Sequence, residues 1–218
     1  MEKQHDLGRN ATTAEVPYFL FSEASRFHFF NRIFQLIEKV EGDVVECGVG
    51  WGRSLLYLLY LLQLETKNRN IWAFDSFEGF PEPTPEDKSE RNIRKGEWKS
   101  DIKLIQEMLL SSGLARDFLN SRLVLIKGFL EESLKNYRGD TIALLHIDVD
   151  LYQSYLSVLN QLYDRVQTGG VIIFDEYVNT NELIKFPGAK KAIDEFFVGK
   201  EEIIIRDKTY GKYYTVKK

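Results

Sequence analysis

The sequence predicts a single α/β domain built on a mostly parallel sheet, and two observations lead to this prediction. Short runs rich in Val and Ile alternate with stretches of helical periodicity along the 218 residues. The central runs, 142–148 and 170–175, are apolar almost throughout, as expected of strands that helices cover on both faces. A single domain also fits the length, because domains commonly hold roughly 50–200 residues and can run somewhat longer.

The composition excludes several classes of protein. Hydrophobic residues make up 44% of the chain and charged residues 28%, which suits a buried core in a charged shell. The net charge of -4 is spread along the chain, so neither nucleic acid nor a membrane surface is an expected partner. The longest apolar stretch, 55–64, is much shorter than the roughly 18 residues of a membrane span. With one cysteine, Cys47, and no secretory start in its first 20 residues, the chain is expected to be cytoplasmic and to bind small molecules.

Seven strands are predicted, at 43–47, 70–75, 122–126, 142–148, 170–175, 202–207 and 213–217. A helix with one apolar face over 152–166 would join two parallel strands, and 188–198 has a similar pattern. Only residues 208–212 join the last two strands, which is too few for a parallel crossover. We therefore expect a seven-stranded sheet, parallel except for its last strand, with helices on both faces.

Two stretches, 1–20 and 78–99, lack this alternation and are interpreted as flexible. The second directly follows the carboxyl end of a predicted strand. Loops in that position build the ligand sites of open α/β sheets, so 78–99 is a candidate substrate-side loop. The alternative is a solvated connector.

A glycine-rich turn follows the first strand in Glu46-Cys-Gly-Val-Gly-Trp-Gly-Arg-Ser54. Glycines let the backbone approach a ligand closely, and the following helix presents free N–H groups. The third glycine comes one residue earlier than in the dinucleotide pattern G-x-G-x-x-G. Glu46, at the strand tip, would repel a pyrophosphate and attract an ammonium group. The turn therefore favours a ligand with an amino-acid moiety, and a tight turn without a ligand is the alternative.

Asp75 ends the second predicted strand, 25 residues after Gly50. A carboxylate in that position can accept hydrogen bonds from both hydroxyls of a ribose. The alternative is a residue that forms a turn or caps a helix.

Three more acids follow the fourth and fifth predicted strands: Asp148, and the pair Asp175 and Glu176. Neighbouring strand tips lie about 5 Å apart, so these carboxylates should converge on the edge that holds the glycine turn. A hard divalent cation such as Mg²⁺ or Ca²⁺ would relieve their repulsion. One or two acids could instead cap helices, Asp148 or Asp150 before Tyr152, and Asp175 after its strand.

Four segments together resemble the TylF/MycF (macrocin) O-methyltransferase family over about residues 43–198. They are the glycine turn, Phe74-Asp-Ser-Phe-Glu-Gly-Phe-Pro81, Asp148-Val-Asp-Leu-Tyr152 and Gly169-Gly-Val-Ile-Ile-Phe-Asp-Glu-Tyr177. The resemblance implies a Rossmann-like class I methyltransferase fold, S-adenosylmethionine as methyl donor, and Mg²⁺. It also implies a sugar or sugar-bearing small molecule as acceptor, and a homo-oligomer.

The resemblance also implies roles for individual residues. Asp148, Asp175 and Glu176 would bind the metal, although Glu176 stands where the resemblance leads us to expect Asp. The cofactor would contact Glu46, Gly48, Gly50, Ser54, Asp75, Ser76, Gly128, Phe129 and Asp148. Asp148 is the expected catalytic base, which removes the proton of a hydroxyl.

His146 is the competing base, because by strand periodicity it shares a face with Asp148. A hydrogen-bonded core histidine is the alternative for that position. Two other functions stay open for the chain, an NAD(P)-dependent oxidoreductase and a non-catalytic S-adenosylmethionine-binding protein. The glycine spacing and Glu46 weigh against the first, and the clustered acids against the second.

Overall fold

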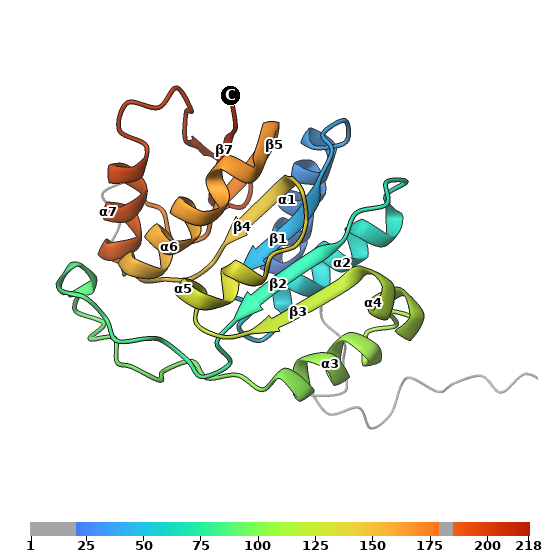
Figure 1. Cartoon of the computed structure of the whole chain (residues 1–218), viewed down its shortest axis with the longest axis horizontal. Helices are drawn as coiled ribbons and strands as arrows, with labels where there is room; N and C mark the ends of the chain where they lie inside the picture. Colours follow the sequence, from blue (N-terminus) through green and yellow to red (C-terminus); the bar gives the residue numbers. More distant parts are fainter. Residues whose placement is uncertain (1–20, 179–184) are drawn as a thin grey trace, which may run out of the picture.

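The computed structural model describes residues 21–178 and 185–218, and its centre is a seven-stranded sheet in the order β3-β2-β1-β4-β5-β7-β6 (Figure 1). The strands β1 to β5 are parallel, while β7 runs antiparallel to both β5 and β6. This confirms the predicted sheet and its antiparallel last strand. The bounds are β1 Asp43–Cys47, β2 Ile71–Asp75, β3 Leu123–Lys127, β4 Ile142–Ile147, β5 Val166–Phe174, β6 Ile205–Arg206 and β7 Tyr213–Val216.

Helices cover both faces of the sheet (Figure 1). One face packs against α1 (Phe21–Leu36), α2 (Arg53–Leu64), α3 (Ile102–Ser111) and α4 (Arg116–Arg122). The other packs against α5 (Leu130–Ser133), α6 (Tyr152–Leu162) and α7 (Pro187–Phe196). Three short 3₁₀ turns complete the order, η1 (Pro85–Asp87), η2 (Leu134–Asn136) and η3 (Tyr163–Arg165). Successive strand residues alternate between the two cores, as Val44 and Val45 do, because strand side chains alternate between faces.

Two strand predictions differ from the structure. β5 begins at Val166 rather than at 170, and it contains Gly169 in a left-handed conformation with φ of 83°. Glycines weaken a strand pattern, so the sequence signal began only after them. The sixth strand shortens from 202–207 to Ile205–Arg206, because it lies at the sheet edge and pairs there only with β7.

The predicted flexible segment 1–20 lies outside the described residues. The segment 78–99, in contrast, has internal structure. The backbone N–H of Phe80 donates to the carbonyl of Glu97 at 3.0 Å, and that of Gly96 donates to the carbonyl of Phe80 at 2.9 Å. The segment leaves the end of β2 and passes along the edge where the parallel strands end, towards α7 (Figure 1).

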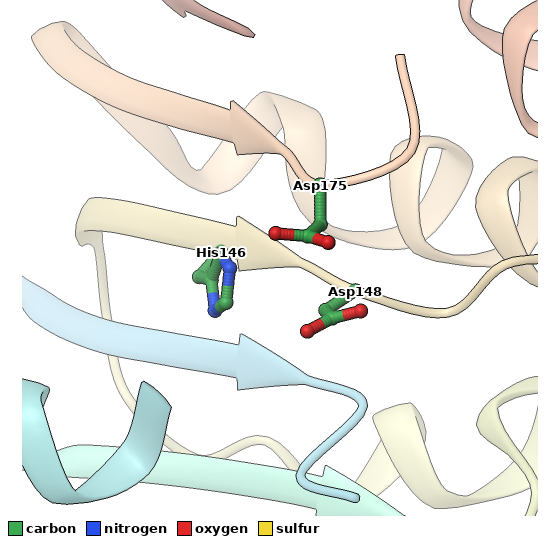
Figure 2. Close-up of side chains that lie close together, drawn as sticks. All are labelled: His146, Asp148 and Asp175. Carbon is green, nitrogen blue, oxygen red and sulfur yellow. The ribbon is translucent and has the colours of Figure 1, made fainter. Parts of the chain in front are cut away.

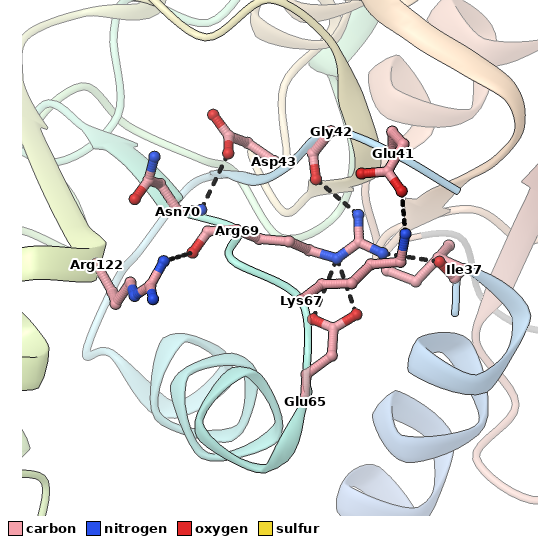
Figure 3. A network of polar contacts seen from close by, with 9 residues as sticks. All are labelled: Ile37, Glu41, Gly42, Asp43, Glu65, Lys67, Arg69, Asn70 and Arg122. Atoms are coloured by element: carbon pink, nitrogen blue, oxygen red, sulfur yellow. Dashed lines mark hydrogen bonds and ion pairs between the residues drawn. The ribbon is translucent and has the colours of Figure 1, made fainter. Parts of the chain in front are cut away.

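A polar network around Arg69 ties the amino ends of β1 and β2 to the helices beside them (Figure 3). Arg69 is 3% exposed and donates to the carbonyls of Ile37 and Gly42, at 2.8 and 2.7 Å, and to the carboxylate of Glu65. These contacts join the segment after α1, the start of β1 and the segment after α2. This network lies at the end of the sheet opposite to the carboxyl ends of the parallel strands.

No helix in the described part of the chain is long and apolar enough to span a membrane.

Candidate functional site

A cavity of about 440 Å³ opens at the carboxyl ends of β1, β2, β4 and β5. The strand order changes direction between β1 and β4, and ligands of open α/β sheets bind at such a point. The glycine turn, the end of β2, the segment 78–99, the start of α5 and several acids line it. The lining residues on which the following paragraphs depend are Gly48, Gly50, Ser54, Asp75, Ser76, Phe80, Trp98, Phe129, Asp148, Asp150 and Asp175.

The glycine turn has the geometry that the sequence predicted. Gly48 has φ of 90°, and a Cβ there would lie 1.7 Å from the carbonyl oxygen of Asp148, so only glycine lets the tips of β1 and β4 pass. Gly50, with φ of 53°, faces open space. Gly52 is the N-cap of α2 and is also left-handed. The turn therefore brings bare backbone to the cavity wall at Gly50.

Asp75 holds this turn in place. One carboxylate oxygen accepts the backbone N–H groups of Val49 and Gly50, both at 2.9 Å, and the other accepts that of Phe77 at 2.7 Å. Both Asp75 and Ser76 line the cavity. Asp75 thus forms the turn that was its alternative assignment, while its carboxylate stays at the surface of the cavity.

The remaining predicted cofactor residues separate into two groups. Ser54 and Phe129 line the cavity. Gly128 is not among the lining residues, and its backbone N–H donates to the carbonyl of Asp75 at 2.9 Å. Gly128 therefore positions the chain that carries Phe129.

Glu46 and His146 form a buried pair below the cavity. They are neighbours in the β1–β4 register, are 0% and 1% exposed, and neither lines the cavity. His146 Nδ1 lies 3.1 Å from Glu46 Oε1, while Glu46 Oε2 has no hydrogen-bond partner within the described residues. Burial lowers the pKa of His146, but its hydrogen bond to Glu46 and the nearby carboxylate charges outweigh this and raise that pKa above its usual value.

The acids after β4 and β5 converge as predicted, in a different grouping (Figure 2). The described part of the chain contains two sets of candidate metal ligands, and within each set the ligand atoms lie within 4.8 Å of one another. One set is His146, Asp148 and Asp175, and the other is Asp148, Asp150 and Glu176. Asp148 belongs to both sets, whereas Asp175 and Glu176 fall in different ones. The sequence interpretation considered Asp150 only as a possible helix cap and not as a metal ligand, although it lies two residues from Asp148.

Asp150 is held in an unusual backbone conformation. Its φ of 63° is left-handed, which costs a non-glycine residue about 1 kcal/mol or more, and its side chain is buried. Burial, with the charges of Asp148 and Asp175, raises the pKa of Asp150 well above its usual value. Such strain and such a shift are typical of functional sites.

Glu176 is anchored from below by Tyr155, whose hydroxyl donates to Glu176 Oε2 at 2.5 Å. Burial, followed by the charges of Asp150 and Asp148, raises the pKa of Glu176 well above its usual value. Burial and the charge of Asp175 raise the pKa of Asp148 to about 6. These carboxylates therefore repel one another, and a cation would favour their ionised forms.

Asp175 differs from the other acids because Lys212 pairs with it. Lys212 lies between β6 and β7, and its ammonium donates to the carboxylate and to the carbonyl of Asp175. Burial raises the pKa of Asp175, but the charge and hydrogen bond of Lys212 outweigh this and lower it below its usual value. Lys212 carried no sequence motif, so its role depends on a contact that only the fold creates.

The fold and this site define a class of protein. The structure matches the O-methyltransferase NovP with a TM-score of 0.73 and 24% identity, covering 88% of this chain and 79% of that one. It matches the calicheamicin methyltransferase CalS11 with a TM-score of 0.76 and 22% identity at the same coverage. The fold is therefore the Rossmann-like fold of class I O-methyltransferases, as predicted.

The family follows from the sequence. A family profile described as Macrocin-O-methyltransferase (TylF) matches residues 23–201, so the chain belongs to that family, which confirms the resemblance. A demethyldecarbamoylnovobiocin O-methyltransferase of Streptomyces niveus is 29% identical over 72% of this chain and 58% of its own length. A mycinamicin III 3''-O-methyltransferase of Micromonospora griseorubida is 26% identical over 74% of this chain and 62% of its own. The chain thus spans about three fifths of the length of these relatives.

Proposed function

We propose that the protein is an S-adenosylmethionine-dependent O-methyltransferase that methylates a hydroxyl of a sugar or of a sugar-bearing small molecule. The observation that supports this best is one cavity lined both by the glycine turn and by the acids Asp148, Asp150 and Asp175. A methyl donor and a hydroxyl base would share that space. Relatives and neighbours carry names that specify sugars, including a rhamnosyl tetracenomycin 4'-O-methyltransferase of Streptomyces olivaceus and the TDP-rhamnose 3'-O-methyltransferase CalS11.

The cavity has the groups that the cofactor needs. Gly50 leaves open space beside the turn, and Phe129, which also lines the cavity, offers a ring that an adenine could contact. A carboxylate has about four acceptor positions, so the three N–H groups bound to Asp75 leave room for a ribose hydroxyl. Glu46 Oε2 could accept a hydrogen bond from an ammonium group that reached the floor of the site. The bound cofactor would supply an electrophilic methyl group.

The acids also fit a divalent cation, and Mg²⁺ is the ion that we propose. The donor set is composed of hard oxygen ligands whose pKa values are raised by burial and mutual repulsion. Asp148 and Glu176 would bind it. Family resemblance makes Asp175 the third ligand, whereas the interatomic distances favour Asp150, since Asp175 is already paired with Lys212. The ion would make a bound hydroxyl more acidic.

Asp148 is the base that the geometry favours over His146. Asp148 lines the cavity, and in the protein without metal its pKa of about 6 leaves it mostly ionised at neutral pH and able to accept a proton. His146 lies below the cavity and faces Glu46. His146 would then support Asp148 electrostatically rather than contact the acceptor.

The first test is calorimetric titration of S-adenosylmethionine, S-adenosylhomocysteine and NAD⁺ into the protein, each with Mg²⁺ and with EDTA. We expect both sulfur compounds to bind, and NAD⁺ not to. Binding of NAD⁺ alone would overturn the methyltransferase assignment in favour of an oxidoreductase. Binding of the cofactor without turnover of any sugar acceptor would favour the non-catalytic alternative.

The role of Asp148 has its own test. Asp148→Asn should abolish methyl transfer, with a loss of at least about 100-fold, because the base would be gone. Binding of S-adenosylhomocysteine should persist. Asp140→Asn, at the exposed start of β4, is the matched control and should keep full activity. Unchanged turnover in Asp148→Asn would show that another group removes the proton.

A further inference from the structure

The part of the cavity wall that the segment 78–99 contributes carries an exposed tryptophan. Trp98 is 55% exposed and lines the cavity together with Phe80, Pro81 and Glu97. A large indole left exposed beside a cavity is more typical of a ligand contact than of a core, because burying it would stabilise the fold.

The orientation of Trp98 is fixed from behind. The guanidinium carbon of Arg91 lies 4.3 Å from the centroid of the Trp98 ring, and 5.1 Å from that of Phe186. The Phe80 ring lies 5.3 Å from the Trp98 ring. Arg91 therefore packs on one face of the indole, whereas Trp98 stays 55% exposed and lines the cavity, which Arg91 does not. The free face, opposite Arg91, is the one that a ligand in the cavity would reach.

The backbone at Trp98 is also specialised. Its φ of 61° is left-handed, which is a rare conformation for a bulky residue. The preceding part of the segment is closely packed, since a Cβ at Gly79 would lie 2.4 Å from the carbonyl oxygen of Glu97. A local strain of this kind, kept by its surroundings, is typical of a functional position.

The wall is joined to the acid cluster through Asp87, which is 3% exposed. One carboxylate oxygen of Asp87 accepts the backbone N–H of Tyr152 at 2.8 Å, at the start of α6 and directly after the loop with Asp148 and Asp150. The other oxygen accepts the N–H and the hydroxyl of Thr84. The segment that carries Trp98 is therefore tied by hydrogen bonds to the end of the loop that carries the acids.

We propose that the free face of Trp98 is the platform on which the acceptor stacks, and that it takes the C–H face of a neutral pyranose ring. This inference rests on the proposed function and assigns its acceptor subsite. The hydroxyls of such a ring could donate to carboxylates that also line the cavity, which are Glu97, Asp148 and Asp150.

The test uses the protein saturated with S-adenosylhomocysteine and methyl α-L-rhamnopyranoside as the probe, followed by ligand-observed NMR. In the wild-type protein we expect the ring protons of the probe to shift upfield, as protons above an indole do. Trp98→Ala should raise the Kd of the probe at least tenfold, and Trp98→Phe, which keeps a ring, by less than about threefold. The Kd of S-adenosylhomocysteine should change less than twofold in both variants.

Leu104→Ala on α3 is the control, because Leu104 is similarly exposed (56%) and does not line the cavity. It should leave both Kd values unchanged. Probe binding by Trp98→Ala equal to wild type, or no probe binding by a wild-type protein that binds S-adenosylhomocysteine, would overturn the platform alone. A wild-type protein that binds no S-adenosylhomocysteine would overturn the proposed function and the platform with it.

Discussion

At the scale of a single residue, Lys212 brings a positive charge into contact with Asp175 of the acid cluster, and this contact should weaken the binding of a cation there. Its ammonium is mostly buried, and the turn that carries it is held by Asp207, whose carboxylate accepts the N–H groups of Thr209 and Tyr210 and pairs with Arg32. Lys212 therefore cannot easily leave Asp175. A divalent cation near Asp148 must bind against this charge.

Lys212→Met should therefore strengthen cation binding. Removing one positive charge beside Asp175 should lower the Kd for Mn²⁺ about tenfold at pH 8, which is above the Asp148 pKa of about 6. Titration of Mn²⁺ followed by electron paramagnetic resonance measures this. Lys208→Met, at an exposed position of the same hairpin, should leave the Kd unchanged. Weaker binding by Lys212→Met would indicate that Lys212 orients Asp175 as a ligand.

At the scale of an element, the segment 78–99 depends on Asp87. Asp87→Ala removes an acceptor for three hydrogen bonds and leaves the N–H of Tyr152 without a partner, so the segment should detach from α6. We expect the KM for the acceptor to rise about tenfold, while the Kd of S-adenosylmethionine changes little. Steady-state kinetics and calorimetry measure the two quantities. Glu86→Ala, at the neighbouring position that pairs with Lys191, is the control and should behave as wild type. Equal losses for cofactor and acceptor would argue against a wall specific to the acceptor.

The network of Arg69 acts on the helices and strands at the other end of the sheet. Arg69→Met would leave two carbonyls and the mostly buried carboxylate of Glu65 without their donor. The free energy of unfolding should fall by roughly 3 kcal/mol, as measured by urea denaturation. Lys67→Met, which removes only the solvent-exposed pair with Glu41, should stay near wild type. A similar effect of both variants would show that Arg69 contributes no more than a surface charge does.

Sequence patterns predicted the helices and strands well where the pattern lies within a single element. The apolar runs at β1, β2 and β4 and the glycine turn depend on local spacing, and the structure has them within a residue or two. The candidate site was less predictable because its contacts join distant segments. Lys212 meets Asp175 across 37 residues, and Asp87 meets Tyr152 across 65. The buried pairing of Glu46 with His146 depends on the register between β1 and β4, which no local pattern encodes.

At the scale of the whole molecule, the acid cluster couples folding to pH. Asp148, Asp150 and Glu176 have raised pKa values in the folded state, so in the protein without metal their contribution to stability is present at low pH. The contribution of Asp148 to the free energy of unfolding is lost as the pH rises from about 4 through its folded-state pKa of about 6. The raised pKa of His146 also makes the folded state less stable as the pH rises. The lowered pKa of Asp175 makes it more stable as the pH rises.

A cation that binds the ionised cluster should reverse this loss. We therefore expect 10 mM MgCl₂ to raise the Tm by several degrees at pH 8 and by much less at pH 5, where protons occupy the carboxylates. Thermal unfolding in MgCl₂ and in EDTA at both pH values measures the difference. In Asp148→Asn, which removes the acid common to both sets of candidate ligands, the effect of Mg²⁺ at pH 8 should disappear. An equal Mg²⁺ effect in Asp148→Asn would place the cation elsewhere on the molecule, because nonspecific stabilisation does not depend on that carboxylate.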